Sequence, residues 1–418
     1  MMNREKLKSF IRFLKQCGSS FTAAEHMKKE LVQKDFVELD YRKSWNLQRG
    51  KAYVLRYEGA LVAFRLGADL SKGFSIIGSH TDSPGFQVKG MELLVKDEDV
   101  RLNTEVYGGP ILNTWFDRPL SLSGRVFLCK QSQIREQIVH FEEPLALFPN
   151  LAIHMNREVN KGYEINPQKE LPLLLTEDRS LRTLLARKLQ VEEQHILDGD
   201  LFLYDIQGPV LMGEKEEYLQ SPRLDNLAMA YASMLAILTA SIEKNSMIIA
   251  WDHEEIGSST QSGADSVLLK EILERILSSE ELNSREAFAL LCSNSFLISA
   301  DMAHGHHPNH EEVGDPLYRP KMGQGPVIKH SARKSYTTTA GSSAFFKTLC
   351  DEAKVPCQVF YNASNRRGGG TISPITASHL MIPSVDVGAP MLAMHSCREL
   401  MHGDDFLSME KVFETFFQ

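Results

Sequence analysis

Apolar residues near the beginning of the chain recur at two different periods, which predict helices and strands in alternation. In residues 5–17 they occur at helical spacing and form one apolar stripe, so we expect an amphipathic helix there. Residues 53–57 and 60–66 flank a Glu-Gly turn and predict a β-hairpin, and residues 74–77 predict a short buried strand. This first part of the chain is typical of an α/β fold.

The middle of the chain has a different pattern. Runs rich in β-forming residues at 92–95, 104–107 and 120–127 are separated by glycine and proline turns, which predicts a mostly antiparallel sheet. Two charged stretches, residues 169–187 and 190–194, are expected to be solvated loops or helix faces. We therefore expect a β-rich domain inserted into the α/β fold.

The α/β pattern returns from about residue 222. The segment LDNLAMAYASMLAILTA predicts a strongly apolar helix, residues 247–251 a buried strand, and residues 264–276 an amphipathic helix with Asp265 at its N-cap. Further apolar strands are expected at residues 295–300 and 384–387. The predicted fold class is α/β, a mainly parallel sheet covered by helices and interrupted by the β-rich domain, with domain limits at residues 1–88, 89–221 and 222–418.

The composition and net charge of the chain limit the kinds of molecule that it is expected to bind. The 46 basic and 54 acidic side chains leave a net charge of 46 − 54 = −8 without a long basic block, which argues against nucleic acid and anionic membranes. The most apolar run, residues 233–240, is far shorter than the ~20 residues that span a bilayer, and the N-terminal segment lacks the pattern of an export signal. The six cysteines lack CxxC spacing and indicate neither a disulfide framework nor a thiolate zinc site. We expect a cytoplasmic protein that acts on small molecules or peptides.

Side chains of the kind that bind metals follow several of the predicted strands. They are His80 with Asp82, residues 252–255, Asp301 and His395, and Asp225 stands at the start of the long apolar helix. In open α/β sheets, sites gather beyond the carboxyl ends of the strands, so we expect these side chains to converge. Imidazole and carboxylate together favour zinc or manganese, and a pair of ions needs a bridging carboxylate, for which Asp225 is the candidate.

Neighbouring acids in this set suit different tasks. Asp82, two residues after His80, can orient the imidazole ring. Of the adjacent Glu254 and Glu255, one can bind metal while the other takes a proton from water and passes it to a leaving amine, and spacing leaves open which does which. The histidine-rich residues 304–310 are either a metal tract or an exposed loop. Each signal is weak alone, and the combination indicates a two-metal site.

Seven motifs also follow one another along the chain in a specific order. They are GSHTDSPGFQVK (78–89), RLDNL (223–227), DHEEIGS (252–258), SADMAHGHHPNH (299–310), GPVIK (325–329), GGTISPI (369–375) and MHSCRE (394–399). Together with YGGPILNTWFDRPLSLSGRV (107–126), they resemble the aspartyl aminopeptidases, the M18 family of metallopeptidases. The resemblance extends from about residue 75 to the C-terminus.

This resemblance implies two bound divalent ions, zinc being expected and manganese or cobalt suiting the same ligands. The ligands that it implies are His80 and Asp301 for one ion, Glu255 and His395 for the other, and Asp225 as the bridge. Asp82 would orient His80, and Glu254 would be the general base. The division of labour between the two glutamates comes from the resemblance alone.

The resemblance also implies a substrate class and an assembly. Family members remove an N-terminal Asp or Glu from peptides, and Lys329 and His304 match the pocket for that acidic side chain. Tyr336 matches a donor near the scissile group, and His154 matches a histidine that the inserted domain delivers into a neighbouring subunit's site. The implied assembly is a homo-oligomer, a dodecamer built from dimers.

The chain departs from the family pattern at two places. FTAAEHM at residues 21–27 lacks a proline-rich pattern, and Arg366, Arg367 and Ser373 stand where other residues are expected, glycine in the last case. These departures concern the shape of the substrate cleft, and none of them removes an implied metal ligand. Alternatives are a two-metal aminopeptidase that prefers neutral residues, and a catalytically silent peptide-binding protein.

Overall fold

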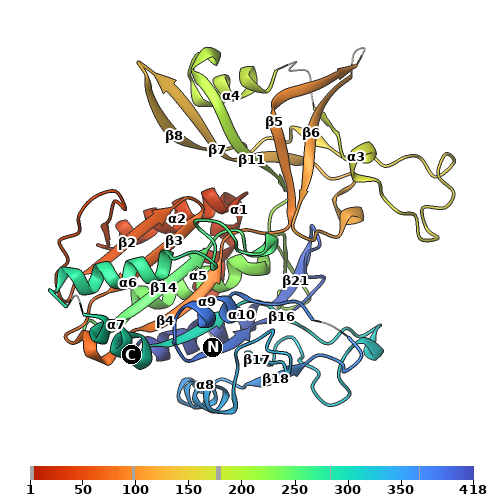
Figure 1. The fold of residues 1–418 in the computed structure, drawn as a ribbon. Coiled ribbons are helices and arrows are strands. Elements are labelled where there is room, and N and C mark those ends of the chain that lie inside the picture. Colours follow the sequence, from red (N-terminus) through yellow and green to blue (C-terminus); the bar gives the residue numbers. More distant parts are fainter. Residues whose placement is uncertain (1–3, 97–98, 176–179, 283, 367) are drawn as a thin grey trace.

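The chain folds into a large sheet covered by helices and a second, β-rich part that stands above it (Figure 1). This computed structural model describes residues 4–96, 99–175, 180–282, 284–366 and 368–418. The predicted α/β fold class is confirmed, because the large sheet is mixed and its central strands are parallel.

The large sheet has nine strands, and its middle positions the site. Strands β14, β4, β15 and β19 are neighbours and run parallel, so their carboxyl ends lie at the same edge of the sheet. The predicted hairpin is present as β2 and β3. In sheet order the strands are β1 (Val37–Glu38), β2 (Ala52–Tyr57), β3 (Ala60–Arg65), β14 (Ser246–Trp251), β4 (Ser75–His80), β15 (Phe296–Ala300), β19 (Ser384–Gly388), β17 (Val327–His330) and β18 (Gln358–Tyr361).

Helices bury apolar side chains against both faces of this sheet. Because side chains alternate along a strand, Ile77 and Ile248 face one helical layer while Ile76 and Ile249 face the other. The first layer consists of α1 (Arg4–Gln16), α2 (Ser20–Val32), α5 (Leu224–Leu238), α8 (Ala340–Ala353) and α10 (Gly403–Phe417). The second consists of α6 (Leu268–Ser279), α7 (Arg285–Asn294) and α9 (Ile372–His379).

The β-rich part is an antiparallel sheet with its own apolar core. Six strands form a closed ring because β11 pairs with both β5 and β7, and β8 continues the sheet outside the ring. The strands are β11 (Ile196–Asp205), β5 (Gly85–Lys96), β6 (Asp99–Tyr107), β10 (Leu173–Leu175), β9 (Ala146–Leu147), β7 (Leu120–Lys130) and β8 (Gln133–His140), accompanied by α3 (Pro167–Glu170) and α4 (Leu181–Leu189). The domain limits at residues 88 and 221 stay a prediction.

A third, smaller sheet lies beside the carboxyl ends of the large one. Its order is β12 (Val210–Met212), β13 (Tyr218–Ser221), β21 (Glu399–His402), β20 (Pro390–Leu392) and β16 (Ala303–His304). Short 3₁₀ turns complete the elements: η1 (Leu70–Lys72), η2 (Leu112–Trp115), η3 (Glu193–His195), η4 (Glu254–Ile256) and η5 (Glu311–Val313). Within the described ranges, none of the helices has the length and apolar character needed to cross a bilayer.

One predicted helix boundary is wrong. The expected N-cap Asp265 lies before α6, which begins at Leu268 after Val267. The carboxylate of Asp265 instead accepts hydrogen bonds from the hydroxyl of Ser259 and the ring of His379. These partners come from the preceding loop and from the end of α9, so local capping preference was overridden by contacts made across the fold.

Candidate metal centre

The loops after three neighbouring parallel strands meet at one point. His80 is the last residue of β4, η4 with Glu254 and Glu255 follows β14, and Asp301 follows β15 directly. Gly388 in β19 permits this packing, because a Cβ atom there would lie 1.9 Å from the main-chain oxygen of Asp301. The sheet therefore gathers these side chains as the sequence predicted.

Five of these side chains form two groups that share Asp225. The Nε2 atom of His80 lies 3.5 Å from Oδ1 of Asp225 and 3.7 Å from Oδ1 of Asp301. The Nε2 atom of His395 lies 3.5 Å from Oδ2 of Asp225 and 3.4 Å from Oε2 of Glu255. Each group could hold a cation, and Asp225 presents one carboxylate oxygen to each.

The chemistry of this cluster fits divalent metal ions. Asp225 is buried, and its Oδ1 atom has no hydrogen-bond partner among the described residues. A buried acceptor of this kind is costly unless a cation or donor satisfies it. Imidazole nitrogen and carboxylate oxygen are the ligand types that zinc takes.

The charges of the cluster shift its pKa values strongly. Burial alone would lower the pKa of His80, but its close contacts with the carboxylates of Asp225, Asp301 and Asp82 raise it well above its ordinary value. Burial raises the pKa of Glu255 well above its ordinary value, and the Asp225 carboxylate adds to this shift. The cluster thus gathers more negative charge than its imidazoles offset, which favours cation binding.

Glu254 lies beside this cluster. One of its carboxylate oxygens falls within 4.8 Å of ligand atoms of His80 and Glu255. Burial is the main cause that raises its pKa to about 7; the Asp301 carboxylate adds to the shift, and the His80 imidazole opposes it. A carboxylate with a pKa near the working pH is suited to general base catalysis.

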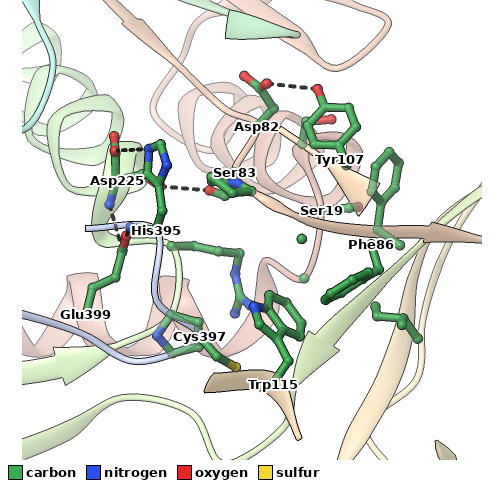
Figure 2. Close-up of a pocket in the computed structure, with 18 of the residues that line it drawn as sticks. Ser19, Asp82, Ser83, Phe86, Tyr107, Trp115, Asp225, His395, Cys397 and Glu399 are labelled. Atoms are coloured by element: carbon green, nitrogen blue, oxygen red, sulfur yellow. Dashed lines mark hydrogen bonds and ion pairs between the residues drawn. The ribbon is translucent and has the colours of Figure 1, made fainter. Parts of the chain in front are cut away.

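Asp82 joins the His80 side to the Glu254 turn. Its Oδ1 atom lies 3.3 Å from Nδ1 of His80, and the main-chain N–H groups of Glu254 and Glu255 each donate to its carboxylate at 3.1 Å. The hydroxyl of Tyr107, at the end of β6 in the ring sheet, donates to it at 2.8 Å (Figure 2). The sequence predictions assigned Tyr107 no role, and its place in the motif at 107–126 is the signal that could have found it.

Glu399 supports the other side of the cluster and was also missed. This buried first residue of β21 accepts main-chain hydrogen bonds from Asp225 at 3.1 Å and His395 at 2.7 Å (Figure 2). Burial raises its pKa to about 8, with the Asp225 carboxylate adding to the shift. Glu399 ends the motif MHSCRE, yet its distance from Asp225 along the chain hides the contact in the sequence.

The comparison with protein families agrees with this geometry. The sequence profile described as "Aminopeptidase I zinc metalloprotease (M18)" matches residues 13–417. The chain belongs to this family. The M18 family consists of zinc-dependent aminopeptidases, so the chain is a peptidase of the hydrolase class.

Relatives and solved structures support this membership over the whole length. A "Probable M18 family aminopeptidase 2" from Clostridium acetobutylicum is 43% identical over 427 residues, covering 99% of this chain and 98% of the relative. A chain in the cryo-EM structure of the Ape4 and Nbr1 complex is 31% identical with a TM-score of 0.95, covering 99% of this chain and 85% of that chain. The mApe1 dodecamer from S. cerevisiae shares the fold at 24% identity with a TM-score of 0.85, over 99% of this chain and 97% of that chain.

Several main-chain conformations of this M18 site are strained. His253, His395 and Arg223 have φ values of 63°, 68° and 61°, in the left-handed region that residues with a Cβ atom rarely adopt. His253 precedes η4, Arg223 precedes α5, and His395 is itself in the cluster. Such conformations gather at functional sites, where the surrounding structure holds them.

The predicted acidic-residue pocket lies next to Asp301. Lys329 is only 2% exposed, and its Nζ atom donates to Asp301 O at 2.9 Å, Asp301 Oδ2 at 3.1 Å and Met302 O at 3.2 Å. The Tyr336 ring packs against this ammonium group, with its centroid 5.3 Å from Nζ. His304 is exposed and lines an adjoining cleft of about 300 Å³. All three Lys329 donors thus have partners within the chain.

Other predicted residues lie outside the cluster. Within the described part of the chain, Asp252 and His253 belong to none of the ligand groups, and neither does any histidine at 304–310. The Nδ1 atom of His253 instead lies 2.8 Å from the hydroxyl of Thr260. His154 is exposed and belongs to residues 148–166, the long arm that projects beyond α3 (Figure 1). Arg367 lies outside the described residues.

Proposed function

We propose that this M18 chain hydrolyses the first peptide bond of peptides with an acidic N-terminal residue, using two divalent metal ions at the cluster. The observation that carries the two-ion proposal is the division of the Asp225 carboxylate between the His80 group and the His395 group. His80 and Asp301 would hold one ion, and Glu255 and His395 the other. Zinc fits this donor set best.

Bound divalent ions act as Lewis acids that polarise a peptide carbonyl and make water more acidic. The chain's own residues do the rest. Glu254 accepts a proton from the attacking water at its carboxylate oxygen and returns it to the leaving amine. Asp82 holds the His80 ring and, by accepting the amide hydrogens of Glu254 and Glu255, fixes the turn that carries the base.

The proposed acidic preference rests on the positive charge beside Asp301. Burial disfavours the Lys329 ammonium, but the Asp301 carboxylate outweighs this effect and keeps the pKa of Lys329 above its ordinary value. Lys329 therefore stays charged, and its field attracts a substrate carboxylate that the exposed His304 ring contacts directly. Because every Lys329 donor already has a partner, Lys329 acts through its charge unless the substrate displaces one of those bonds.

We also propose that the chain works as a homo-oligomer in which His154 completes a neighbouring subunit's site. The projecting arm carries exposed apolar side chains around His154, including Ile153 at 49% and Met155 at 73% exposure, which supports burial against another copy. The related mApe1 from S. cerevisiae is a dodecamer, and we propose the same assembly, built from dimers, for this chain.

The deciding experiment measures cleavage of peptides with N-terminal Asp, Glu or Leu before chelation, after chelation and after zinc is restored. Strong, metal-dependent preference for Asp or Glu is expected. Metal-dependent cleavage with a preference for Leu would replace the acidic preference with the neutral one. Absence of cleavage with metal bound would favour the silent peptide-binding alternative.

A Glu254→Gln variant tests the assignment of the base. It keeps the shape of the side chain but cannot take a proton, so kcat should fall by about 10²- to 10⁴-fold. The KM and the bound metal content should change little. Full turnover by Glu254→Gln would overturn the assignment.

A further inference from the structure

An aspartate lies in the middle of strand β19, between two buried valines. Its neighbours Val385 and Val387 pack in the core on the face of α8 and α10, whereas the fully buried Asp386 points to the opposite face. No lysine, arginine or histidine in the described ranges forms an ion pair with it. A buried carboxylate without such a partner is costly unless hydrogen bonds satisfy it, so its presence needs an explanation.

Four hydrogen bonds satisfy the Asp386 carboxylate, and they come from two separate segments. The main-chain N–H and the hydroxyl of Thr337 donate to Oδ2 at 2.7 and 2.9 Å. The hydroxyl of Ser373 also donates to Oδ2, and that of Thr371 donates to Oδ1, both at 2.6 Å. The main-chain N–H of Asp386 in turn donates to the hydroxyl of Thr338 at 2.9 Å.

The second of these segments borders the proposed substrate cleft, and the first lies beside the Lys329 ammonium group. Thr337 directly follows Tyr336, whose ring packs on the Lys329 ammonium group. Thr371 directly follows the glycine run 368–370, of which Gly368 and Gly369 line the cleft with His304. Thr371 occupies the N-cap position of α9, yet its hydroxyl makes no cap hydrogen bond and bonds Asp386 instead.

We propose that Asp386 is a positioning residue that holds the Tyr336 segment and the glycine segment together and thereby sets the shape of the substrate cleft. This inference rests on the proposed use of that cleft for the N-terminal side chain. Asp386 acts through these segments and touches neither the ligand cluster nor the substrate.

Ser373 adds a side-chain donor to this arrangement. Its hydroxyl stands where the family resemblance leads us to expect glycine, which has no side-chain donor. At 0% exposure it donates to Asp386, and its oxygen lies 3.1 Å from that of Thr337, whose one hydroxyl proton can go either to Ser373 or to Asp386. Ser373 therefore bonds the glycine segment to β19 and places it in contact with the Thr337 segment.

The test compares Asp386→Asn, Ser373→Ala and Thr337→Val in the full-length zinc enzyme. For whichever of the Asp, Glu and Leu peptides the parent enzyme cleaves best, we expect KM to rise about 10-fold in Asp386→Asn and about 3-fold in the other two, since one hydrogen bond contributes modestly. The kcat value should change less than KM. A protein that is only less stable would lose active enzyme, so its apparent kcat would fall while KM stayed constant.

The matched control is Ser246→Ala, which removes a fully buried hydroxyl from β14 in the large sheet. This hydroxyl has no hydrogen-bond partner among the described residues. Its KM should equal that of the parent. Unchanged KM in Ser373→Ala and Thr337→Val would overturn the inference even if Asp386→Asn fails to fold. A parent enzyme that shows no preference for Asp or Glu peptides would overturn the proposed function but not this inference. The KM values are compared on the best substrate, whichever peptide that is.

Discussion

The two halves of the proposed metal centre share Asp225 but are built differently. His80 and Asp301 come from the ends of adjacent parallel strands, and the His80 side chain is 1% exposed. His395 comes from the loop between β20 and β21, and its side chain is 31% exposed. The first half is thus set by the sheet alone, whereas the second combines Glu255, which follows β14, with a histidine on a strained loop.

Different supports compensate for this difference. Asp82 and Lys329 hold the first half from within the large sheet and its loops. The second half is held by the buried Glu399 in the third sheet, and by the main-chain oxygen of Gly109, 3.1 Å from Nδ1 of His395, in the segment between β6 and η2. One proposed ion site is thus set mainly by regular strand pairing, and the other by contacts among three sheets. We therefore expect the His395 half to bind its ion more weakly.

The largest effect should come from changing the residue that both halves share. Asp225→Asn removes one of the two charged oxygens and puts an amide nitrogen, which cannot bind a cation, in its place. We expect activity to fall ~10³-fold, as when a major electrostatic contribution to the transition state is lost. Metal content, measured by mass spectrometry, should fall below one ion per chain, and a variant that still binds two ions would contradict the shared role.

The next largest effects should come from changing Glu399 and Asp82, which support the two halves. Glu399→Gln should weaken the ion of the His395 half more than the other, and Asp82→Asn the ion of the His80 half more. The affected ion should lose about 10- to 100-fold in affinity, as is typical when a partner of a ligand is lost. Zinc titration by calorimetry separates the two sites. Equal weakening of both sites by either variant would show that the halves are not independent.

Graded chelation sharpens the same comparison without a mutation. Increasing amounts of a chelator should remove the ion of the His395 half first, because exposed ligands exchange more readily than buried ones. Metal content and peptide cleavage are followed together, and we expect a plateau at one ion per chain with most activity already lost. Simultaneous release of both ions would contradict the predicted order.

The smallest effect should come from Tyr107→Phe. This change removes one of the hydrogen bonds to Asp82 and leaves those from the amides of Glu254 and Glu255. We expect kcat to fall about 2- to 10-fold, the equivalent of one hydrogen bond. A matched control is Tyr231→Phe, a buried phenol in α5 whose hydroxyl donates to Glu30 at 3.2 Å. The kcat values of the two variants are measured with one acidic peptide. Equal kcat values would show that the Tyr107 hydroxyl does not support catalysis.

The sequence predicted most of the large sheet and the ligand cluster for a physical reason. A buried parallel strand such as β4 or β14 appears as a short apolar run, and a polar residue directly after it must lie at the carboxyl edge. His80 and Asp301 could therefore be placed from local pattern alone, whereas the choice of Glu255 over Glu254 as the ligand came from the family resemblance. Asp265 was misplaced as a cap because its partner His379 is 114 residues away.

The sequence by itself determined the fold class, the family and the set of candidate ligands, because apolar periodicity and strand-end residues are local properties of the chain. Only the tertiary structure decided which groups support them. Tyr107 and Glu399 reach the cluster from the ring sheet and the third sheet, and Lys329 is paired with Asp301 instead of standing open in a pocket. These contacts join segments far apart in sequence, and burial makes their hydrogen bonds obligatory only once the sheets have packed.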